Sequence, residues 1–174
     1  MNIRIAGEHD LPQIVEIYNQ AVAQRGATAD LTPITVEARR QWFHDHAPDS
    51  WPIWVMADDG AILGWCSLSA YRPGRMALRH TAEISYYIHE AHRRKGIGSS
   101  LIRHAIDQCP GLRIKNLFSL LLDVNIPSTR ILEKSGFVKW GHMPGVAELD
   151  GETCGHLIYG RPVRQPPGSE ADKG

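Results

Sequence analysis

A basic turn containing two glycines is the segment of this sequence best suited to hold a ligand. Residues 92–100 read HRRKGIGSS and lead into a pattern typical of an amphipathic helix. The first turn of a helix leaves about four backbone N–H groups unpaired and carries about half a positive charge. Glycines at positions 96 and 98 let the backbone approach a ligand closely, because neither has a Cβ atom. The segment therefore predicts a site for a phosphate or diphosphate group.

Two other nucleotide-binding motifs do not fit this turn. The dinucleotide-binding fingerprint of an oxidoreductase needs a third glycine at the position of Leu101. The P-loop needs Gly-Lys followed by Ser or Thr after a longer glycine loop, a pattern that this sequence lacks. The remaining alternative is a turn that only connects a strand to a helix. The three consecutive basic residues before Gly96 favour the anion site over that alternative.

A carboxylate lies in the strand predicted just before this turn. Over residues 81–89, apolar side chains alternate onto one face, while Glu83 shares the other face with polar residues. A central strand is usually apolar on both faces, and a buried charge needs a partner or a function. Glu83 is therefore a candidate functional residue, and the alternative is an ordinary ion pair with Arg79 or Arg72.

The elements that must position these residues follow a mixed α/β pattern. Apolar periodicity predicts helices over 11–24, 35–46, 98–109 and 126–135, with Asp10 and Gln13 as a capping box for the first. Alternating or continuous apolar runs predict strands over 2–6, 53–57, 61–69, 81–89, 117–124, 137–143 and 153–159. We therefore expect a mixed central sheet of six to seven strands flanked by about four helices.

Composition narrows the class of protein. The chain has 174 residues, with 19 Lys and Arg balancing 19 Asp and Glu, so it lacks the basic excess of a nucleic-acid-binding protein. No apolar run is long enough to span a membrane. Three widely spaced cysteines predict reduced thiols in a cytoplasmic protein and no zinc cluster. We expect one domain over 1–164 and a disordered tail over 165–174, where large apolar side chains are absent.

Two motifs resemble those of the GNAT superfamily of N-acetyltransferases. The pattern R-x-x-G-x-G at 93–98 is similar to its acyl-CoA-binding motif, and N-x-x-S at 125–128 with Gly-Phe at 136–137 is similar to the segment after its fifth strand. Matches at 17–22, 27–28, 33–43, 64–69 and 81–89 resemble the phosphinothricin and methionine sulfoximine N-acetyltransferase subfamily. The resemblance implies a GNAT fold, acetyl-CoA as co-substrate without a metal, a small amine as acceptor and a homodimer.

The resemblance also implies roles for individual residues. The strand before the turn would pair its backbone with the pantetheine arm, the turn would hold the diphosphate, and the later motif would contact the arm or its sulfur. The implied cofactor-binding residues are Tyr87, Ile88, His89, Arg93, Arg94, Lys95, Gly96, Ile97, Gly98, Ser99, Asn125 and Ser128. The alternative for Asn125 is a helix N-cap, and both roles are compatible.

On the acceptor side, the resemblance implies that Glu83 is the general base for direct acetyl transfer to an amine. Arg72 and Arg75 are candidates to clamp a substrate carboxylate, since a guanidinium matches its two oxygens. The alternative for both is a solvated loop charge. Thr28 is a candidate wall of the substrate pocket.

The sequence departs from the related enzymes at three positions. Leu132 stands where many superfamily members have a tyrosine that protonates the leaving thiolate, and Thr153 and Gly155 stand where the subfamily has Trp and Asp. The substrate could therefore be another small amine or a peptide N-terminus. A non-catalytic acyl-CoA-binding domain is the alternative from another functional class, and Glu83 argues against it.

Overall fold

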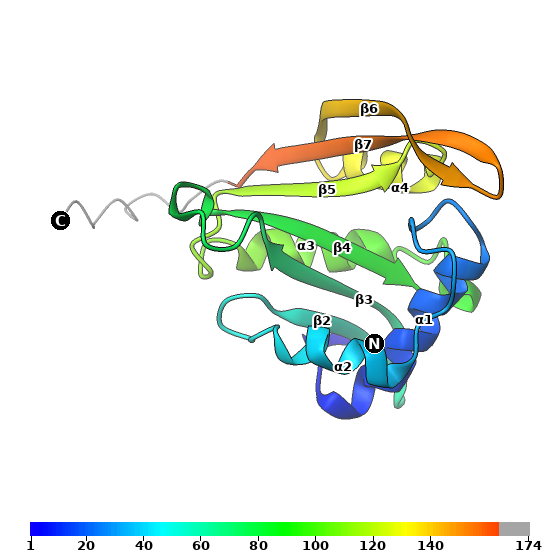
Figure 1. Ribbon diagram of the computed structural model, residues 1–174. Helices are drawn as coiled ribbons and strands as arrows, with labels where there is room; N and C mark the ends of the chain where they lie inside the picture. Colours follow the sequence, from blue (N-terminus) through cyan, green and yellow to red (C-terminus); the bar gives the residue numbers. More distant parts are fainter. Residues whose placement is uncertain (164–174) are drawn as a thin grey trace.

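The computed structural model describes residues 1–163 and forms one seven-stranded sheet in the order β1-β2-β3-β4-β5-β7-β6 (Figure 1). The predicted tail over 165–174 lies outside the described residues. The strands are β1 (Asn2–Ile5), β2 (Ile53–Asp58), β3 (Ala61–Ala70), β4 (Thr81–Ile88), β5 (Asn116–Leu122), β6 (Val138–Leu149) and β7 (Glu152–Pro162). The α-helices are α1 (Leu11–Ala23), α2 (Val36–His44), α3 (Ile97–Gln108) and α4 (Ile126–Lys134). The predicted fold class is thus confirmed.

Two apolar clusters fix the helices against the sheet. Leu101, Ile102 and Ala105 of α3 and Leu132 of α4 pack with buried residues of β3, β4 and β5 in one cluster. The apolar stripe of α1 packs with Trp65 and its neighbours on β2 and β3 in the other cluster. Burial of these stripes supplies most of the stability of such helices. The sheet is thereby held between α1 and α2 on one face and α3 and α4 on the other.

The parallel ladder between β4 and β5 stops halfway along the two strands. Its register partners are Thr81 with Asn116, Ala82 with Leu117 and Glu83 with Phe118. Beyond Glu83, β4 continues to Ile88 without pairing to β5, and the two strands diverge toward their C-terminal ends (Figure 1). Strands that separate within a sheet leave backbone N–H and C=O groups available to a ligand.

Two details of the predicted elements are wrong. The strand expected over 137–143 runs as β6 to Leu149, because its pairing with β7 resumes after an irregularity between Met143 and Ala147. The carboxylate of Asp10 does not cap α1. It accepts hydrogen bonds from the Arg4 guanidinium at 2.6 and 2.8 Å and from the Gly7 N–H at 2.8 Å, since a short 3-10 turn precedes the helix.

Candidate active site

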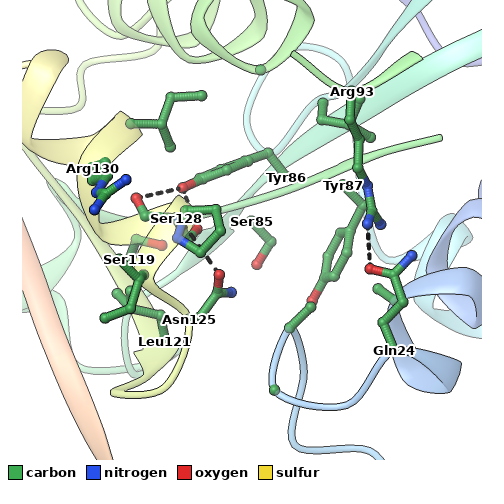
Figure 2. A pocket seen from close by; sticks show the side chains of 18 of the residues that line it. Gln24, Ser85, Tyr86, Tyr87, Arg93, Ser119, Leu121, Asn125, Ser128 and Arg130 are labelled. Atoms are coloured by element: carbon green, nitrogen blue, oxygen red, sulfur yellow. Dashed lines mark hydrogen bonds between the residues drawn. The ribbon is translucent and has the colours of Figure 1, made fainter. Parts of the chain in front are cut away.

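A cavity of about 1180 Å³ occupies the gap between β4 and β5. Its walls come from the diverging ends of both strands, the first turns of α3 and α4, and the chain just after α1 (Figure 2). Ligand pockets that enclose small molecules and cofactors commonly have volumes of about 300–1,000 Å³. The cavity is therefore large enough for an extended cofactor together with the reacting end of a second substrate.

The turn before α3 forms a concave run of backbone donors at one end of this cavity. Arg94 and Gly96 have φ angles of 61° and 81°, and their left-handed conformations turn successive N–H groups toward one side. Within residues 1–163, no backbone acceptor is found for the six consecutive N–H groups of residues 94–99, which include those of Arg94, Gly96, Gly98 and Ser99. The turn and the N-terminus of α3 thus have the geometry of an anion site.

The basic side chains of the turn are used in different ways. Arg93 and Arg94 both line the cavity, and the guanidinium of Arg93 also donates to the Gln24 side chain just after α1 (Figure 2). Lys95 lies outside the cavity lining, and its ammonium is 3.4 Å from His92 Nδ1. The sequence interpretation missed Arg130 and Lys134, which reach the same cavity from α4. Their spacing of four residues, which places them on one helix face, was the available signal.

The pairing between β3 and β4 decides which backbone groups of β4 face the gap. The N–H of His89 donates to Leu63 O at 3.0 Å, so His89 is bonded to β3. Antiparallel pairs alternate between hydrogen-bonded and non-hydrogen-bonded residues, so Tyr87 also directs its backbone to β3. Tyr86 and Ile88 direct theirs to the gap. Of the three residues expected to offer their backbone to a ligand, Ile88 faces the gap, whereas Tyr87 and His89 face β3, and Tyr86 faces the gap in addition.

The first turn of α4 closes the opposite wall. Asn125 is the N-cap of α4, and its side-chain oxygen accepts from the N–H of Ser128 at 3.2 Å, which confirms the capping role. The Ser128 hydroxyl lies 2.6 Å from the Tyr86 hydroxyl, and this bond joins α4 to β4 (Figure 2). All three residues line the cavity.

Glu83 lies at the point where β4 and β5 separate. It is half-buried, and in the described part of the chain its carboxylate makes no hydrogen bond and no ion pair. Burial raises the pKa of Glu83 above that of an ordinary glutamate. The alternative of an ion pair with Arg79 or Arg72 is wrong, because the Arg79 guanidinium instead donates to Met76 O at 2.9 Å.

Comparison with known proteins connects this geometry to a reaction class. The model of the Acetyltransferase (GNAT) family matches residues 12–137. The chain belongs to the GNAT acetyltransferase family. It is an acyltransferase, in agreement with the activity expected from its motifs.

Several relatives of this acetyltransferase have names that specify a substrate. It is 42% identical to a Bacillus subtilis protein named "Putative phosphinothricin acetyltransferase YwnH", over 92% of this chain and 98% of that protein. It is 33% identical to the L-methionine sulfoximine/L-methionine sulfone acetyltransferase of Pseudomonas aeruginosa, over 86% and 87% of the two chains. The crystal structure of a phosphinothricin acetyltransferase from Sinorhizobium meliloti in complex with acetyl-CoA superposes with a TM-score of 0.87, at 26% identity and 99% and 96% coverage.

Helix α2 contains Trp42, which together with Thr28 is a sequence candidate for the wall of the substrate pocket, with core packing as the alternative. None of its residues is fully buried, and its inward face carries Arg39 and Trp42, with His46 just beyond its end. The Arg39 guanidinium lies 3.7 Å from the centre of the Trp42 ring, and Arg39 Nε is buried without a hydrogen-bond partner in the described residues. Trp42 also packs against the core cluster around Trp65, so this face of α2 combines core packing with a buried guanidinium.

The predicted acceptor residues lie at two different places. Arg72 and Arg75 are exposed in the loop between β3 and β4, close in sequence to Glu83, and no side-chain partner is found for either within residues 1–163. Thr28 lies after α1, where its hydroxyl is 2.9 Å from the Tyr18 hydroxyl. Neither arginine contributes to the main cavity lining, and Ala27, next to Thr28, does.

The departures from the subfamily pattern have structural counterparts. Leu132 is completely buried in the core, so it leaves the leaving-group position to other residues. At Gly155, a Cβ atom would lie 2.3 Å from His142 Nε2 and 2.4 Å from Asp123 Oδ2. The Asp123–His142 pair, 3.2 Å apart, therefore occupies the space that a larger side chain at position 155 would need.

The three cysteines are buried and unpaired. Burial raises the pKa of Cys66 and raises that of Cys109 to about 12. Both thiols are therefore protonated at neutral pH and are poor nucleophiles. Among residues 1–163, no group of three His, Cys, Asp or Glu side chains is placed to hold a metal ion, and no helix is long and apolar enough to cross a membrane.

Proposed function

We propose that this acetyltransferase transfers the acetyl group of acetyl-CoA to the amino group of a small amino-acid-like substrate of the phosphinothricin or methionine sulfoximine type. The observation that carries the proposal is the position of Glu83. Its unpartnered carboxylate lies at the point where β4 and β5 separate, next to a cavity that begins with an anion-binding turn. The names of the relatives support the acceptor class.

Different groups of cavity residues match the successive parts of acetyl-CoA, from the diphosphate to the pantetheine arm. The N–H groups of Arg94, Gly96, Gly98 and Ser99 would hold the diphosphate, with Arg94, Arg130 and Lys134 adding positive charge beside it. Ile97 belongs to the same helix turn. The backbone of Tyr86 and Ile88 would pair with the pantetheine arm, opposite Asn125 and Ser128. Lys95 and His89 lie outside the cavity lining. Lys95 would add positive charge near the diphosphate, and His89 would help to shape the turn.

In the reaction, Glu83 accepts a proton from the substrate ammonium group, directly or through one water. An α-amino group titrates near pH 8, so only about a tenth is neutral at pH 7 and a base is needed. The neutral amine then forms a C–N bond to the acetyl carbon, and the C–S bond breaks as the thiolate of CoA leaves; the nitrogen loses its second proton to this thiolate, so that the products are the amide and the CoA thiol. We assign no covalent enzyme intermediate, because the described cysteines are buried. Positioning of the two reactants supplies much of the rate.

The departing thiolate needs a proton that Leu132 cannot give. The Tyr86 and Ser128 hydroxyls lie 2.6 Å apart on the cavity wall, so one donates to the other and the second hydroxyl hydrogen is free to be donated to the thiolate. Burial raises the pKa of Tyr86, which keeps this hydroxyl protonated at every pH at which the enzyme would work.

Arg72 and Arg75 would hold the carboxylate of the acceptor, and Thr28 would wall the pocket at its other side. Both arginines are free of side-chain partners in the described residues and lie beside the strand that carries Glu83. A bidentate guanidinium–carboxylate contact would fix the amino group relative to the base.

We also propose a cytoplasmic homodimer formed through β6. This strand is the edge of the sheet and exposes Val138, Trp140, Met143 and Val146 by 40% to 59%. An exposed apolar edge is a liability in a monomer, and a twofold contact would cover it with the same edge of a second copy. Light scattering should give twice the chain mass of 19.4 kDa, and Trp140→Lys should give the monomer. A monomeric wild type would contradict this.

The function is tested by CoA release with a panel of acceptors. We expect thiol release with phosphinothricin, methionine sulfoximine or another amino acid, and much slower release with simple amines or a peptide N-terminus. The same protein without acceptor is the control for hydrolysis. Equal rates with and without every amine would contradict the proposal, and a peptide preferred over all amino acids would replace the substrate class.

A further inference from the structure

His46 connects α2 to the strand beside Glu83 through two hydrogen bonds. Its Nδ1 lies 2.7 Å from Trp42 O, and its Nε2 lies 3.2 Å from Ser69 Oγ. The imidazole also packs on the Trp42 ring, with centroids 4.5 Å apart. These contacts hold both ring nitrogens in place at once.

The directions of these two hydrogen bonds follow from the chemistry of the groups. A backbone carbonyl can only accept, so His46 Nδ1 carries the hydrogen. In a neutral imidazole the other nitrogen is then an acceptor, and burial lowers the pKa of His46, which favours that neutral form. Ser69 must therefore donate its single hydroxyl hydrogen to His46 Nε2.

Ser69 is the register partner of Glu83 across β3 and β4. Both side chains point to the same face, and directly opposite residues have Cβ atoms about 4.5–5.5 Å apart. Because its hydrogen is committed to His46, Ser69 can offer only lone pairs to Glu83. A lone pair accepts from a protonated carboxyl group and does nothing to stabilise a carboxylate.

We propose that His46, acting through Ser69, keeps hydrogen-bond donors away from Glu83 and thereby makes it a stronger base. This rests on the proposed function in taking Glu83 as the base, and it makes His46 and Ser69 positioning residues. When His46 is protonated, Nε2 becomes a donor, Ser69 rotates, and its hydroxyl hydrogen is free to stabilise the Glu83 carboxylate. The proton affinity of Glu83 thus depends on the state of His46.

Few other charged side chains lie near His46, Ser69 and Glu83. From α2 and its C-terminal end, Arg39 lowers and Asp45 raises the pKa of His46. From β3, Ser69 brings no charge, and from β4 the titratable groups on this face are Glu83 and Tyr87. From α1, the ring of Tyr18 has its centre 5.2 Å from the Arg39 guanidinium carbon. None of these donates to the Glu83 carboxylate in the described residues.

The test follows the Glu83 carboxyl carbon by ¹³C NMR across pH in the protein without substrate, with Glu83→Gln to assign the signal. His46→Phe keeps a ring over Trp42 and frees the Ser69 hydroxyl, so the Glu83 midpoint should fall by about one to two pH units. Ser69→Ala should leave the midpoint near the wild-type value, and the double variant should match Ser69→Ala. His104→Phe is the matched control, since His104 also packs on a tryptophan, Trp54, but from the opposite face of the sheet.

Each outcome is decisive. An unchanged midpoint in His46→Phe, or an equal fall in the double variant, would overturn the proposal. If His46→Phe does not fold, ¹⁵N NMR of the wild-type imidazole decides, because the proposal requires hydrogen on Nδ1 and none on Nε2 at neutral pH. The experiment needs no turnover. If Glu83→Gln retains full activity while the midpoint shifts as expected, the role of Glu83 as the base fails and the coupling stands; the acetyltransferase function itself is tested separately by CoA release with the acceptor panel.

Discussion

Glu83 and Phe118 are the last register partners of the parallel ladder between β4 and β5. The carboxylate is therefore placed where hydrogen bonding within the sheet ends and the cavity begins. A residue at this position is fixed by the paired part of β4 yet is next to the cavity between the two strands. This explains how a half-buried glutamate without a protein partner can be tolerated in a central strand.

Replacement of the proposed base should separate catalysis from binding. Glu83→Gln should lower kcat by about 10²–10⁴-fold, because an amide cannot accept the proton. The dissociation constant for acetyl-CoA, measured by calorimetry, should change little. Glu152→Gln, at the exposed start of β7, is the control and should keep full activity. An unchanged kcat in Glu83→Gln would remove this residue from the mechanism.

The same variant should change how stability depends on pH. Burial raises the pKa of Glu83 in the folded state, so unfolding releases a proton at pH values between the unfolded and folded pKa. The free energy of unfolding therefore falls as pH rises above the unfolded pKa, and the loss is complete once pH exceeds the folded pKa. Glu83→Gln should raise Tm by about 2–4 °C at pH 8 and have little effect at pH 4, as measured by calorimetry. A gain of equal size at both pH values would contradict burial of the charge.

Substitution of Gly96 should abolish cofactor binding. Its φ of 81° is strongly disfavoured for a β-branched residue, so Gly96→Val must change the turn that presents the N–H groups. Gly60→Val is the matched control, because Gly60 has a φ of 80° and, like Gly96, would place a Cβ atom with no neighbour within 4 Å. Calorimetry with acetyl-CoA should detect binding only in the control. Retained binding in Gly96→Val would place the diphosphate elsewhere.

The carboxylate clamp predicts an acceptor-specific defect. Arg72→Ala and Arg75→Ala should raise KM for amino acids by about tenfold or more, since a charge-assisted bond contributes about 1.5–3 kcal/mol. KM for decarboxylated analogues and for acetyl-CoA should stay the same. Arg79→Ala, in the same loop but bonded to Met76 O, is the comparison. Wild-type kinetics that do not distinguish an amino acid from its decarboxylated analogue would end this assignment.

The hydroxyl pair on the cavity wall should affect the leaving group. Tyr86→Phe removes the hydroxyl that lies 2.6 Å from Ser128 and keeps the ring. We expect kcat to fall about tenfold with acetyl-CoA, with binding of CoA nearly intact. Tyr159→Phe, which removes a hydroxyl bonded to Glu133 outside the cavity, is the control. Equal kcat in the two variants would leave protonation of the thiolate to water.

Local patterns of the sequence determined much of this protein. Apolar periodicity located every α-helix and strand of the described residues to within a few residues, except at the end of β6, but not the three short 3-10 helices. The glycines and basic residues before α3 indicated the anion site, and the polar face of a strand expected to be central indicated Glu83. These features depend on residues close together in the chain, where periodicity and turn chemistry act directly.

Only the tertiary structure decided what faces the cavity. Register with β3 turned the backbone of Tyr86 and Ile88 to the gap, and packing of α4 brought Arg130 and Lys134 to it. The contact between His46 and Ser69 joins residues 23 positions apart. Such contacts depend on how separate elements pack together, and a one-residue change of register would reverse every side chain of a strand, so no local pattern contains them.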